Sequence, residues 1–328
     1  MVKISDISLG EFPLLLAPME DVSDPPFRAL CKENGADVVY TEFISSEGLI
    51  RDAAKSVQKL DIYEKERPVG IQIFGANLDS MLRSVEIVEA SKPDIIDINF
   101  GCPVKKVVSK GAGAGILRDI PLMVKLTAEM VKHTSLPLTV KTRLGWDHDS
   151  IKIVEVAERL QDVGVKAISI HGRTRAQMYK GDADWKPISA VKNNSRMHIP
   201  IFGNGDVNSP ERAMEMRDRY GLDGAMIGRA SIGNPWFFNQ VKNYFKKGTY
   251  SDYPTLKDRV EVAKRHLEMS IAWKGEVLGV LETRRHYANY FKGIPDFKLY
   301  RKAMVTTNDS NGVFETLNRV LDEVAEPA

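Results

Sequence analysis

The chain has 328 residues, 43% of them hydrophobic, which suits a large core and an α/β barrel with an appended segment. No apolar run approaches the ~20 residues that a membrane span needs, and residues 1–10 lack the order of a signal peptide, so we expect a cytoplasmic protein. Two cysteines, Cys31 and Cys102, exclude a disulfide framework, and no Cys/His spacing resembles a zinc site, so no metal is expected.

Eight short β-branched segments recur along the chain, each ending in a polar or glycine-containing turn. Amphipathic segments lie between them, as at 78–90, 121–133, 150–163 and 210–220, and several open with Asp, Ser or Pro at capping positions. These repeated units predict a (β/α)8 TIM barrel, because an open doubly wound sheet usually carries a Gly-x-Gly-x-x-Gly turn that is absent here. The predicted strands are Leu14–Pro18, Asp37–Thr41, Val69–Phe74, Asp94–Asn99, Leu138–Arg143, Ala167–His171, Ile199–Phe202 and Gly224–Ile227.

The pattern changes near residues 248–254, after which strand-like segments stop. We expect helices at 255–273 and 280–291, and frayed residues at 323–328. The chain is therefore predicted to divide into a barrel domain (residues 1–247) and an all-helical domain (residues 248–328).

Positive charge is concentrated in one segment of this nearly neutral chain, whose formal net charge is +2. Residues 246–302 carry 13 basic and 7 acidic residues, whereas residues 1–245 carry 32 of each. Such a block indicates an anionic polymer such as nucleic acid, although a solvated helical face explains the same bias about as often.

A candidate chemical site follows the fourth predicted strand, at Asp97-Ile-Asn-Phe-Gly-Cys-Pro103. Gly101 permits a sharp turn and Pro103 removes a backbone donor, so Cys102 is expected at the carboxyl end of a strand. The glycine-rich run at 110–115 lets backbone approach a bulky ligand. A lone cysteine is usually a small buried hydrophobe, but this context favours a reactive role for Cys102.

The carboxyl ends of all strands meet on one face of a barrel, so residues that close strands become neighbours there. This set lacks the paired carboxylates of glycosidases, a Ser-His-Asp order and a P-loop, and cofactor chemistry fits it better. Its members are Pro18, Met19, Glu20, Glu42, Gln72, Asn99, Cys102, Lys141, Arg143, His171, Arg173, Gly203, Asn204, Gly205, Asp206, Gly228 and Arg229.

The last two predicted strands end in turns that suit a phosphate, Gly203-Asn-Gly-Asp206 and Gly228-Arg229. Small residues expose backbone N–H groups, and an arginine can fork onto phosphate oxygens. Lys141 and His171 are expected to face a cofactor ring, where a cation stabilises the negative charge of a reduced flavin. Either side chain can also be merely solvated or structural.

Across nearly its whole length the chain resembles the tRNA-dihydrouridine synthases, most closely the bacterial B-type branch. Besides the Cys102 stretch, the resemblance rests on Leu16-Ala-Pro-Met19 with Asp24-Pro-Pro-Phe-Arg28, Gln72-Ile-Phe-Gly75, Lys141-Thr-Arg-Leu-Gly-Trp146, His171-Gly-Arg-Thr-Arg175, Asn204-Gly-Asp206 and Gly228-Arg229.

The resemblance implies a barrel that binds FMN, a helical domain that helps to hold tRNA, and hydride from NADPH that reduces the C5=C6 bond of a flipped-out uridine. It implies that Cys102 is the acid that protonates C5. We expect a monomer. The sequence departs from many relatives at Glu20-Asp21, where those have a small residue and glycine. The implied FMN contacts are Pro18, Met19, Glu20, Gln72, Lys141, Asn204, Gly205, Asp206, Gly228 and Arg229, and the position of His171 at a strand end adds it to this set.

Substrate contacts are expected from four residues, Asn99, Arg143, Arg173 and Arg175. Asn99 can pair with the uracil edge, as base-flipping enzymes require. Arginines and lysines around the mouth, including Lys106 and Lys110, can meet RNA phosphates, unless they are solvated surface charges.

Three alternatives remain open from the sequence. An enzyme of dihydroorotate-dehydrogenase type would also use FMN and a loop cysteine in a barrel, but it needs no basic helical appendage. A barrel without catalysis that only binds RNA is a second alternative, and a synthase that acts on another RNA is a third.

Overall fold

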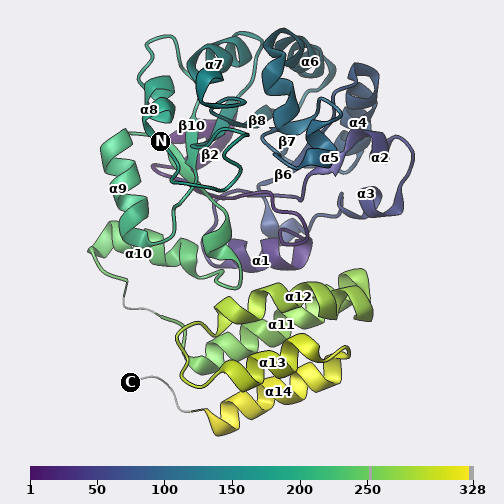
Figure 1. The fold of residues 1–328 in the computed structure, drawn as a ribbon, viewed down its shortest axis with the longest axis vertical. Coiled ribbons are helices and arrows are strands. Elements are labelled where there is room, and N and C mark those ends of the chain that lie inside the picture. Colours follow the sequence, from purple (N-terminus) through teal and green to yellow (C-terminus); the bar gives the residue numbers. More distant parts are fainter. Residues whose placement is uncertain (251–252, 325–328) are drawn as a thin grey trace.

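The structure, a computed structural model, describes residues 1–250 and 253–324. Eight parallel strands form a ring that closes where Leu15 bridges Val38, beside β4 (Figure 1). The predicted TIM barrel and all eight predicted strands are therefore confirmed. In chain order the strands are β3 (Leu14–Leu16), β4 (Val39–Tyr40), β6 (Val69–Phe74), β7 (Ile95–Phe100), β8 (Leu138–Arg143), β9 (Ala167–His171), β10 (Ile201–Asn204) and β11 (Gly224–Ile227), and a short β5 (Ile44–Ser45) extends the pairing of β6.

Helices cover the outside of the ring, and their ends follow the capping residues. Ser209 caps α9 by accepting a hydrogen bond from the N–H of Arg212, and Gly221 ends that helix at φ 62°, a conformation that favours glycine. The helices are α1 (Pro25–Glu33), α2 (Ser46–Leu49), α3 (Ala54–Gln58), α4 (Leu78–Ala90), α5 (Lys105–Val108), α6 (Ile120–His133), α7 (Ile153–Asp162), α8 (Lys186–Lys192), α9 (Pro210–Tyr220) and α10 (Phe237–Lys247).

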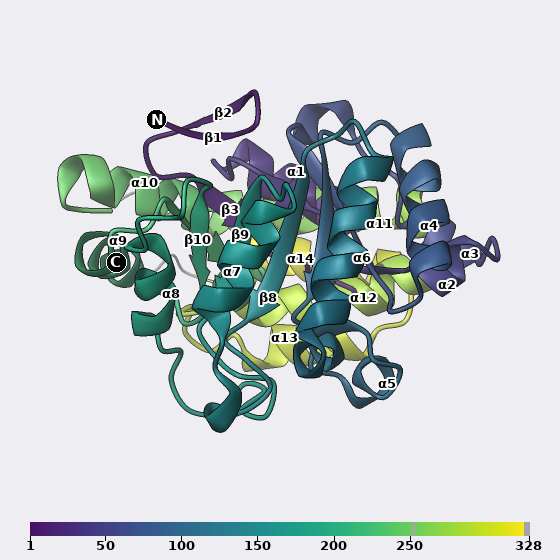
Figure 2. The same ribbon diagram turned by 90° about the horizontal axis from the view of Figure 1, so that it is seen from above.

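An N-terminal hairpin that the sequence did not predict closes one end of the barrel. Strands β1 (Val2–Ile4) and β2 (Ile7–Gly10) pair antiparallel at the end opposite to α5 (Figure 2). Ile4 and Leu9 are buried among barrel-interior residues such as Phe202. A ligand therefore meets an open barrel only at the carboxyl ends of the strands.

Four helices, α11 (Leu256–Lys274), α12 (Glu276–Tyr290), α13 (Lys298–Thr306) and α14 (Ser310–Glu323), form a C-terminal helical region with its own hydrophobic core. Figure 1 places it below the barrel, and α11 packs against α1. The first two helices match the sequence predictions, and α13 and α14 were not predicted individually. The division into two domains stays a prediction, and of the residues expected to fray, 325–328 lie outside the described ones. No described helix is long and apolar enough to cross a membrane.

Candidate active site

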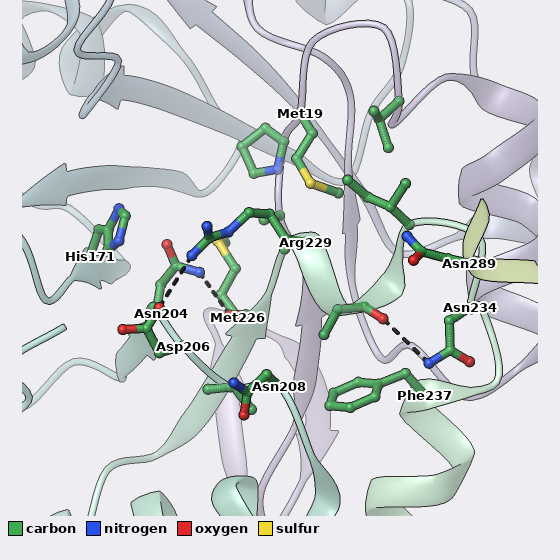
Figure 3. A pocket seen from close by; sticks show the side chains of 18 of the residues that line it. Met19, His171, Asn204, Asp206, Asn208, Met226, Arg229, Asn234, Phe237 and Asn289 are labelled. Carbon is green, nitrogen blue, oxygen red and sulfur yellow. Dashed lines mark hydrogen bonds and ion pairs between the residues drawn. The ribbon is translucent and has the colours of Figure 1, made fainter. Parts of the chain in front are cut away.

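A pocket of about 1060 Å³ opens at the carboxyl ends of the strands, between the barrel loops and the helical region (Figure 3). Most of the sequence-predicted site residues line it, although they come from six different strand ends. They are Pro18, Met19, Glu20, Asn99, Cys102, Lys141, Arg143, His171, Asn204, Gly205, Asp206, Gly228 and Arg229.

The turn that carries Cys102 is held by a chain of buried amides. The side-chain oxygen of Asn99 accepts hydrogen bonds from the backbone N–H groups of Gly101 (3.0 Å) and Cys102 (2.8 Å). The Asn99 amide donates to Gln72 (2.8 Å), whose own amide donates to Asp97 (2.5 Å). Burial raises the pKa of Asp97 to about 6. Gln72 therefore lies behind the wall of the pocket and supports Asn99.

The Cys102 thiol is enclosed but reaches the pocket, with 6% of the residue exposed. Arg143 donates to the carbonyl of Gly101 (2.7 Å) and fixes the turn from one side. Gly113 packs against the other side, where a Cβ would lie 2.9 Å from the Cys102 carbonyl oxygen. Burial raises the pKa of Cys102 above its ordinary value, so the sulfur keeps its proton at neutral pH.

Two basic side chains on the neighbouring strands β8 and β9 line the pocket in different protonation states. Lys141 lies 3.3 Å from the side-chain oxygen of Asn204, and burial with the nearby Arg143 lowers its pKa to about 8, so it is still mostly charged at pH 7. Burial and the surrounding cations hold the pKa of His171 well below its usual range. His171 is therefore a neutral hydrogen-bonding group beside a lysine cation.

The β10 and β11 turns meet at Asp206, which the barrel holds in place. Its carboxylate accepts from the N–H of Ala183 (2.7 Å), from Arg173 (2.6 Å) and from Arg229 (3.2 Å). Arg229 points toward Asp206 in Figure 3. Gly205 has a φ of 115°, and a Cβ there would lie 2.7 Å from Ala183, so glycine is required for this turn. An exposed arginine beside a narrow glycine turn can hold a phosphate.

Three predicted site residues do not line the pocket. Gln72 is fully buried, and Arg173 is 2% exposed because it binds Asp206 and the carbonyl of Gly181. Arg175 lies 4.7 Å from the centre of the Trp146 ring. The direction of each side chain depends on tertiary partners that the sequence does not show.

The structure adds lining residues that the sequence analysis missed. Tyr179 is 57% exposed and lies 5.8 Å from the Arg143 guanidinium and 5.4 Å from that of Arg229. The sequence could have indicated Tyr179, because an aromatic residue in a loop rich in basic residues can contact their cations. Asn234 and Asn289 also line the pocket, and the sequence carried no signal for them.

Acidic residues gather where this pocket adjoins a second one of about 870 Å³, with which it shares Glu20. One oxygen each from Glu20, Asp21 and Glu42 lies within 4.8 Å of the others. Lys59 supplies positive charge, 2.6 Å from Glu20 and 3.5 Å from Glu42. Burial raises the pKa of Glu42 to about 7 despite Lys59.

Among solved structures, the fold is shared with large barrel enzymes. The chain resembles histamine dehydrogenase from Rhizobium sp. 4-9 (TM-score 0.54, 13% identity, 81% of this chain and 51% of that one) and 6-hydroxypseudooxynicotine amine oxidase from Pseudomonas geniculata N1 (TM-score 0.57, 13% identity, 79% and 52%). The chain spans about half the length of these structures. At such identities the likeness shows the barrel fold alone.

The family is shown by sequence. The family model described as dihydrouridine synthase matches residues 15–325. The chain is 35% identical to tRNA-dihydrouridine synthase B of Pseudomonas putida over 94% of this chain and 92% of that protein, and 34% identical to tRNA-dihydrouridine synthase B of Pasteurella multocida over 90% and 89%. The chain belongs to the dihydrouridine synthase family. The resemblance seen in the sequence is confirmed, and with it the expected class of flavin-dependent oxidoreductase.

Proposed function

We propose that this protein reduces the C5=C6 bond of uridine in tRNA, with bound FMN and with NADPH as the reductant. The observation that carries the proposal is a protonated thiol, Cys102, held on the wall of a pocket whose opposite side has a phosphate-type turn. Bound FMN supplies the hydride for uracil C6.

The lining residues fit such a cofactor. Arg229 and the backbone around Gly205 and Gly228 would hold the FMN phosphate, since a Cβ on Gly228 would meet nothing closer than 3.8 Å and the space beside it is open. Lys141 would supply a cation near the flavin ring, and His171 would supply a neutral imidazole nitrogen. The other pocket-lining contacts implied by the family resemblance, Pro18 to Glu20, Asn204 and Asp206, remain part of this proposal, whereas Gln72 lies behind the pocket wall.

Cys102 and Asn99 would act on the uracil. The thiol donates its proton to C5, which quenches the charge left when hydride reaches C6. Asn99 has both lone pairs of its oxygen engaged by the turn, so only its remaining N–H is left to donate to a uracil carbonyl. Asn99 therefore positions the acid, Cys102, through the turn and orients the uracil ring through its remaining N–H.

RNA would be held by Arg143, Arg173 and Arg175 at or behind the pocket mouth, and by the basic helical region. Arg175 is the best placed of the three for a phosphate, because it is partly exposed whereas Arg143 and Arg173 are each 2% exposed. We propose a cytoplasmic monomer, in keeping with a tRNA substrate.

The test is reaction of the purified, flavin-loaded protein with unmodified tRNA and NADPH or NADH, followed by mass spectrometry of the nucleosides. Dihydrouridine, two hydrogens heavier than uridine, is expected, with NADPH as the better reductant. Turnover of dihydroorotate without any change in tRNA would contradict the proposal.

A further inference from the structure

The loop between β3 and α1, residues 17–24, is here called the first loop, and it forms one wall of the pocket. Pro18, Met19 and Glu20 line the pocket from this loop. Few internal bonds hold it: the carbonyl of Met19 accepts from the N–H groups of Val22 (3.2 Å) and Ser23 (3.0 Å), and the Ser23 hydroxyl accepts from the N–H of Met19 (2.8 Å). Support from outside the loop comes first from the barrel, where Glu42 accepts from the N–H of Asp21 and Lys59 lies 2.6 Å from Glu20, and then from the helical region.

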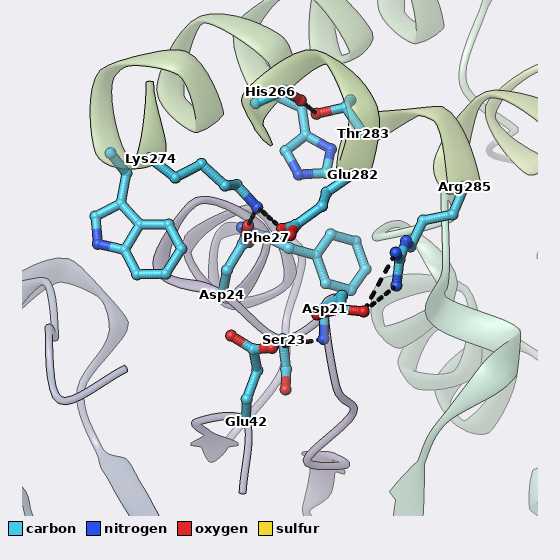
Figure 4. Close-up of polar contacts among 12 residues, drawn as sticks. Asp21, Ser23, Asp24, Phe27, Glu42, His266, Lys274, Glu282, Thr283 and Arg285 are labelled. Carbon is cyan, nitrogen blue, oxygen red and sulfur yellow. Dashed lines mark hydrogen bonds and ion pairs between the residues drawn. The ribbon is translucent and has the colours of Figure 1, made fainter. Parts of the chain in front are cut away.

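The first loop ends in an ion pair with the helical region (Figure 4). One oxygen of Asp24 caps α1 by accepting from the N–H of Phe27 (3.0 Å), and the other receives the Lys274 ammonium at 2.6 Å. The same ammonium lies 2.6 Å from Glu282. The side chains of Lys274 and Asp24 are only 4% and 5% exposed, so solvent screens this pair weakly.

Two further contacts join the same surfaces. Arg285 of α12 lies 3.4 Å from the carboxylate of Asp21, in the middle of the first loop. Asp21 has a φ of 51°, a left-handed conformation that is unfavourable for a residue other than glycine and that needs such support. Below the loop, the Phe27 ring lies 4.7 Å from the ring of His286 and 5.6 Å from that of His266.

We propose that Lys274, assisted by Arg285, is a positioning residue that holds the first loop in the shape the pocket requires. The helical region then builds one wall of the active site as well as serving as a docking surface for RNA. That the first loop contacts FMN rests on the proposed function. That Lys274 positions the loop does not.

The chain offers a matched control in the ion pair between Lys242 and Asp37, which has the same 2.6 Å length. It joins α10 to the segment before β4, at the closed end of the barrel, and neither residue lines a pocket described above. Its side chains are more exposed, 31% and 21%, so it controls for the loss of an ion pair of this length away from the pocket rather than for the loss of a buried charge.

The variants are Lys274→Met, Lys274→Arg, Lys242→Met and the double variant Lys274→Met with Glu282→Gln, which avoids leaving a second carboxylate unpaired. Two quantities are measured: hydrogen exchange of the amides of residues 19–23 in flavin-free protein, and the FMN dissociation constant. We expect exchange in the first loop to rise roughly tenfold in both variants with methionine at 274. FMN binding should weaken by a similar factor because a wall of its site is mispositioned.

Lys274→Arg should restore both quantities in large part, and Lys242→Met should change neither even if it lowers the melting temperature. Unchanged loop exchange in the double variant, or equal changes in Lys242→Met, would overturn the proposal. Wild-type protein that binds no FMN would instead refute the proposed function, and the exchange data would still decide whether Lys274 positions the loop.

Discussion

On the β10–β11 side of the pocket, Asp206 is held by the barrel itself, through Arg173 and the N–H of Ala183. On the β3 side, Asp24 is held by Lys274, a residue 250 positions later in another part of the fold. The proposed phosphate side of the site is thus complete within the barrel. The side formed by the first loop is held from the barrel at Glu20, by Lys59, and from the helical region at Asp21 and Asp24.

This difference separates cofactor retention from catalytic geometry. A rigid turn built from neighbouring strands is preorganised for a phosphate at all times. A loop fixed across an interface follows any movement of that interface. The Cys102 thiol, the wall formed by the first loop, the wall formed by the β10 and β11 turns (the phosphate wall) and the RNA surface should therefore respond differently to substitution.

The largest effect is expected from Cys102→Ala, because Cys102 belongs to neither wall and acts only on the substrate. Reduction of the bound flavin by NADPH needs no acid at C5 and should proceed at nearly the wild-type rate. Reoxidation by unmodified tRNA should slow by about 10²–10⁴-fold, the usual contribution of a general acid. Stopped-flow absorbance in single turnovers separates the two half-reactions.

Cys102→Ser is the control for shape, since its hydroxyl fills much of the same space but is a far poorer acid, and it should rescue little. Wild-type reoxidation in the alanine variant would remove Cys102 from the mechanism. His171 would then be the next candidate for the acid, despite its lowered pKa.

Glu42, which accepts a hydrogen bond from the N–H of Asp21 in the first loop, should make stability depend on pH. Its pKa is about 7 in the folded protein and near 4.3 when unfolded, so the folded state binds more protons between these values. Stability should therefore fall as pH rises from about 5 to 8, by up to about 3 kcal/mol from this group. Glu42→Gln should remove that part of the slope.

Urea unfolding of flavin-free wild type and Glu42→Gln at several pH values measures the effect. The difference between the two proteins is the informative quantity, because other groups titrate in both. Parallel stability curves would show that Glu42 does not titrate in this range.

The phosphate wall should respond in ligand affinity and hardly in stability. Arg229→Ala should weaken FMN binding by about 1.5–3 kcal/mol, the range for removal of a charge-assisted hydrogen bond. The β10 turn should persist because Arg173 and Ala183 still hold Asp206. Fluorescence titration with FMN checks this, with Arg219→Ala on the outer face of α9 as the control; equal losses in both variants would contradict the assignment.

The smallest effects are expected at the RNA surface. Lys106 and Lys110 are exposed after the Cys102 turn, and replacing either with alanine should weaken tRNA binding only a few-fold. The slope of log affinity against log salt should fall by roughly one for each phosphate that the variant no longer neutralises. Lys3→Ala, on the hairpin at the closed end, should leave the slope unchanged; a similar fall there would indicate non-specific binding.

Local signals explain why so much of the barrel was predictable. The helices α4 and α9 were predicted to the residue, because Asn77 and Ser209 cap them and each carries a clear apolar stripe. The strands are buried on both faces, so they appear as continuous apolar segments. The N-terminal hairpin was missed because its strands of three and four residues carry too little pattern.

The site was predictable as a set of strand ends but not as a set of side-chain interactions. Cys102 and the β10 turn lie in the pocket as the strand ends indicated. The sequence could not show that Arg173 turns inward to Asp206, 33 residues away, or that the Asp21 departure faces Arg285, 264 residues away. Both interactions depend on how distant segments pack.

The buried amide chain beneath Cys102 also has a direction. Asp97, when ionised, can only accept, so Gln72 must turn its NH₂ toward it and its oxygen toward Asn99. Asn99 must in turn give its NH₂ to Gln72, which leaves its oxygen for the N–H of Cys102. The negative charge of Asp97 thereby fixes the orientation of the side-chain amides of Gln72 and Asn99. The position of the Cys102 thiol thus depends on a carboxylate with which it makes no contact.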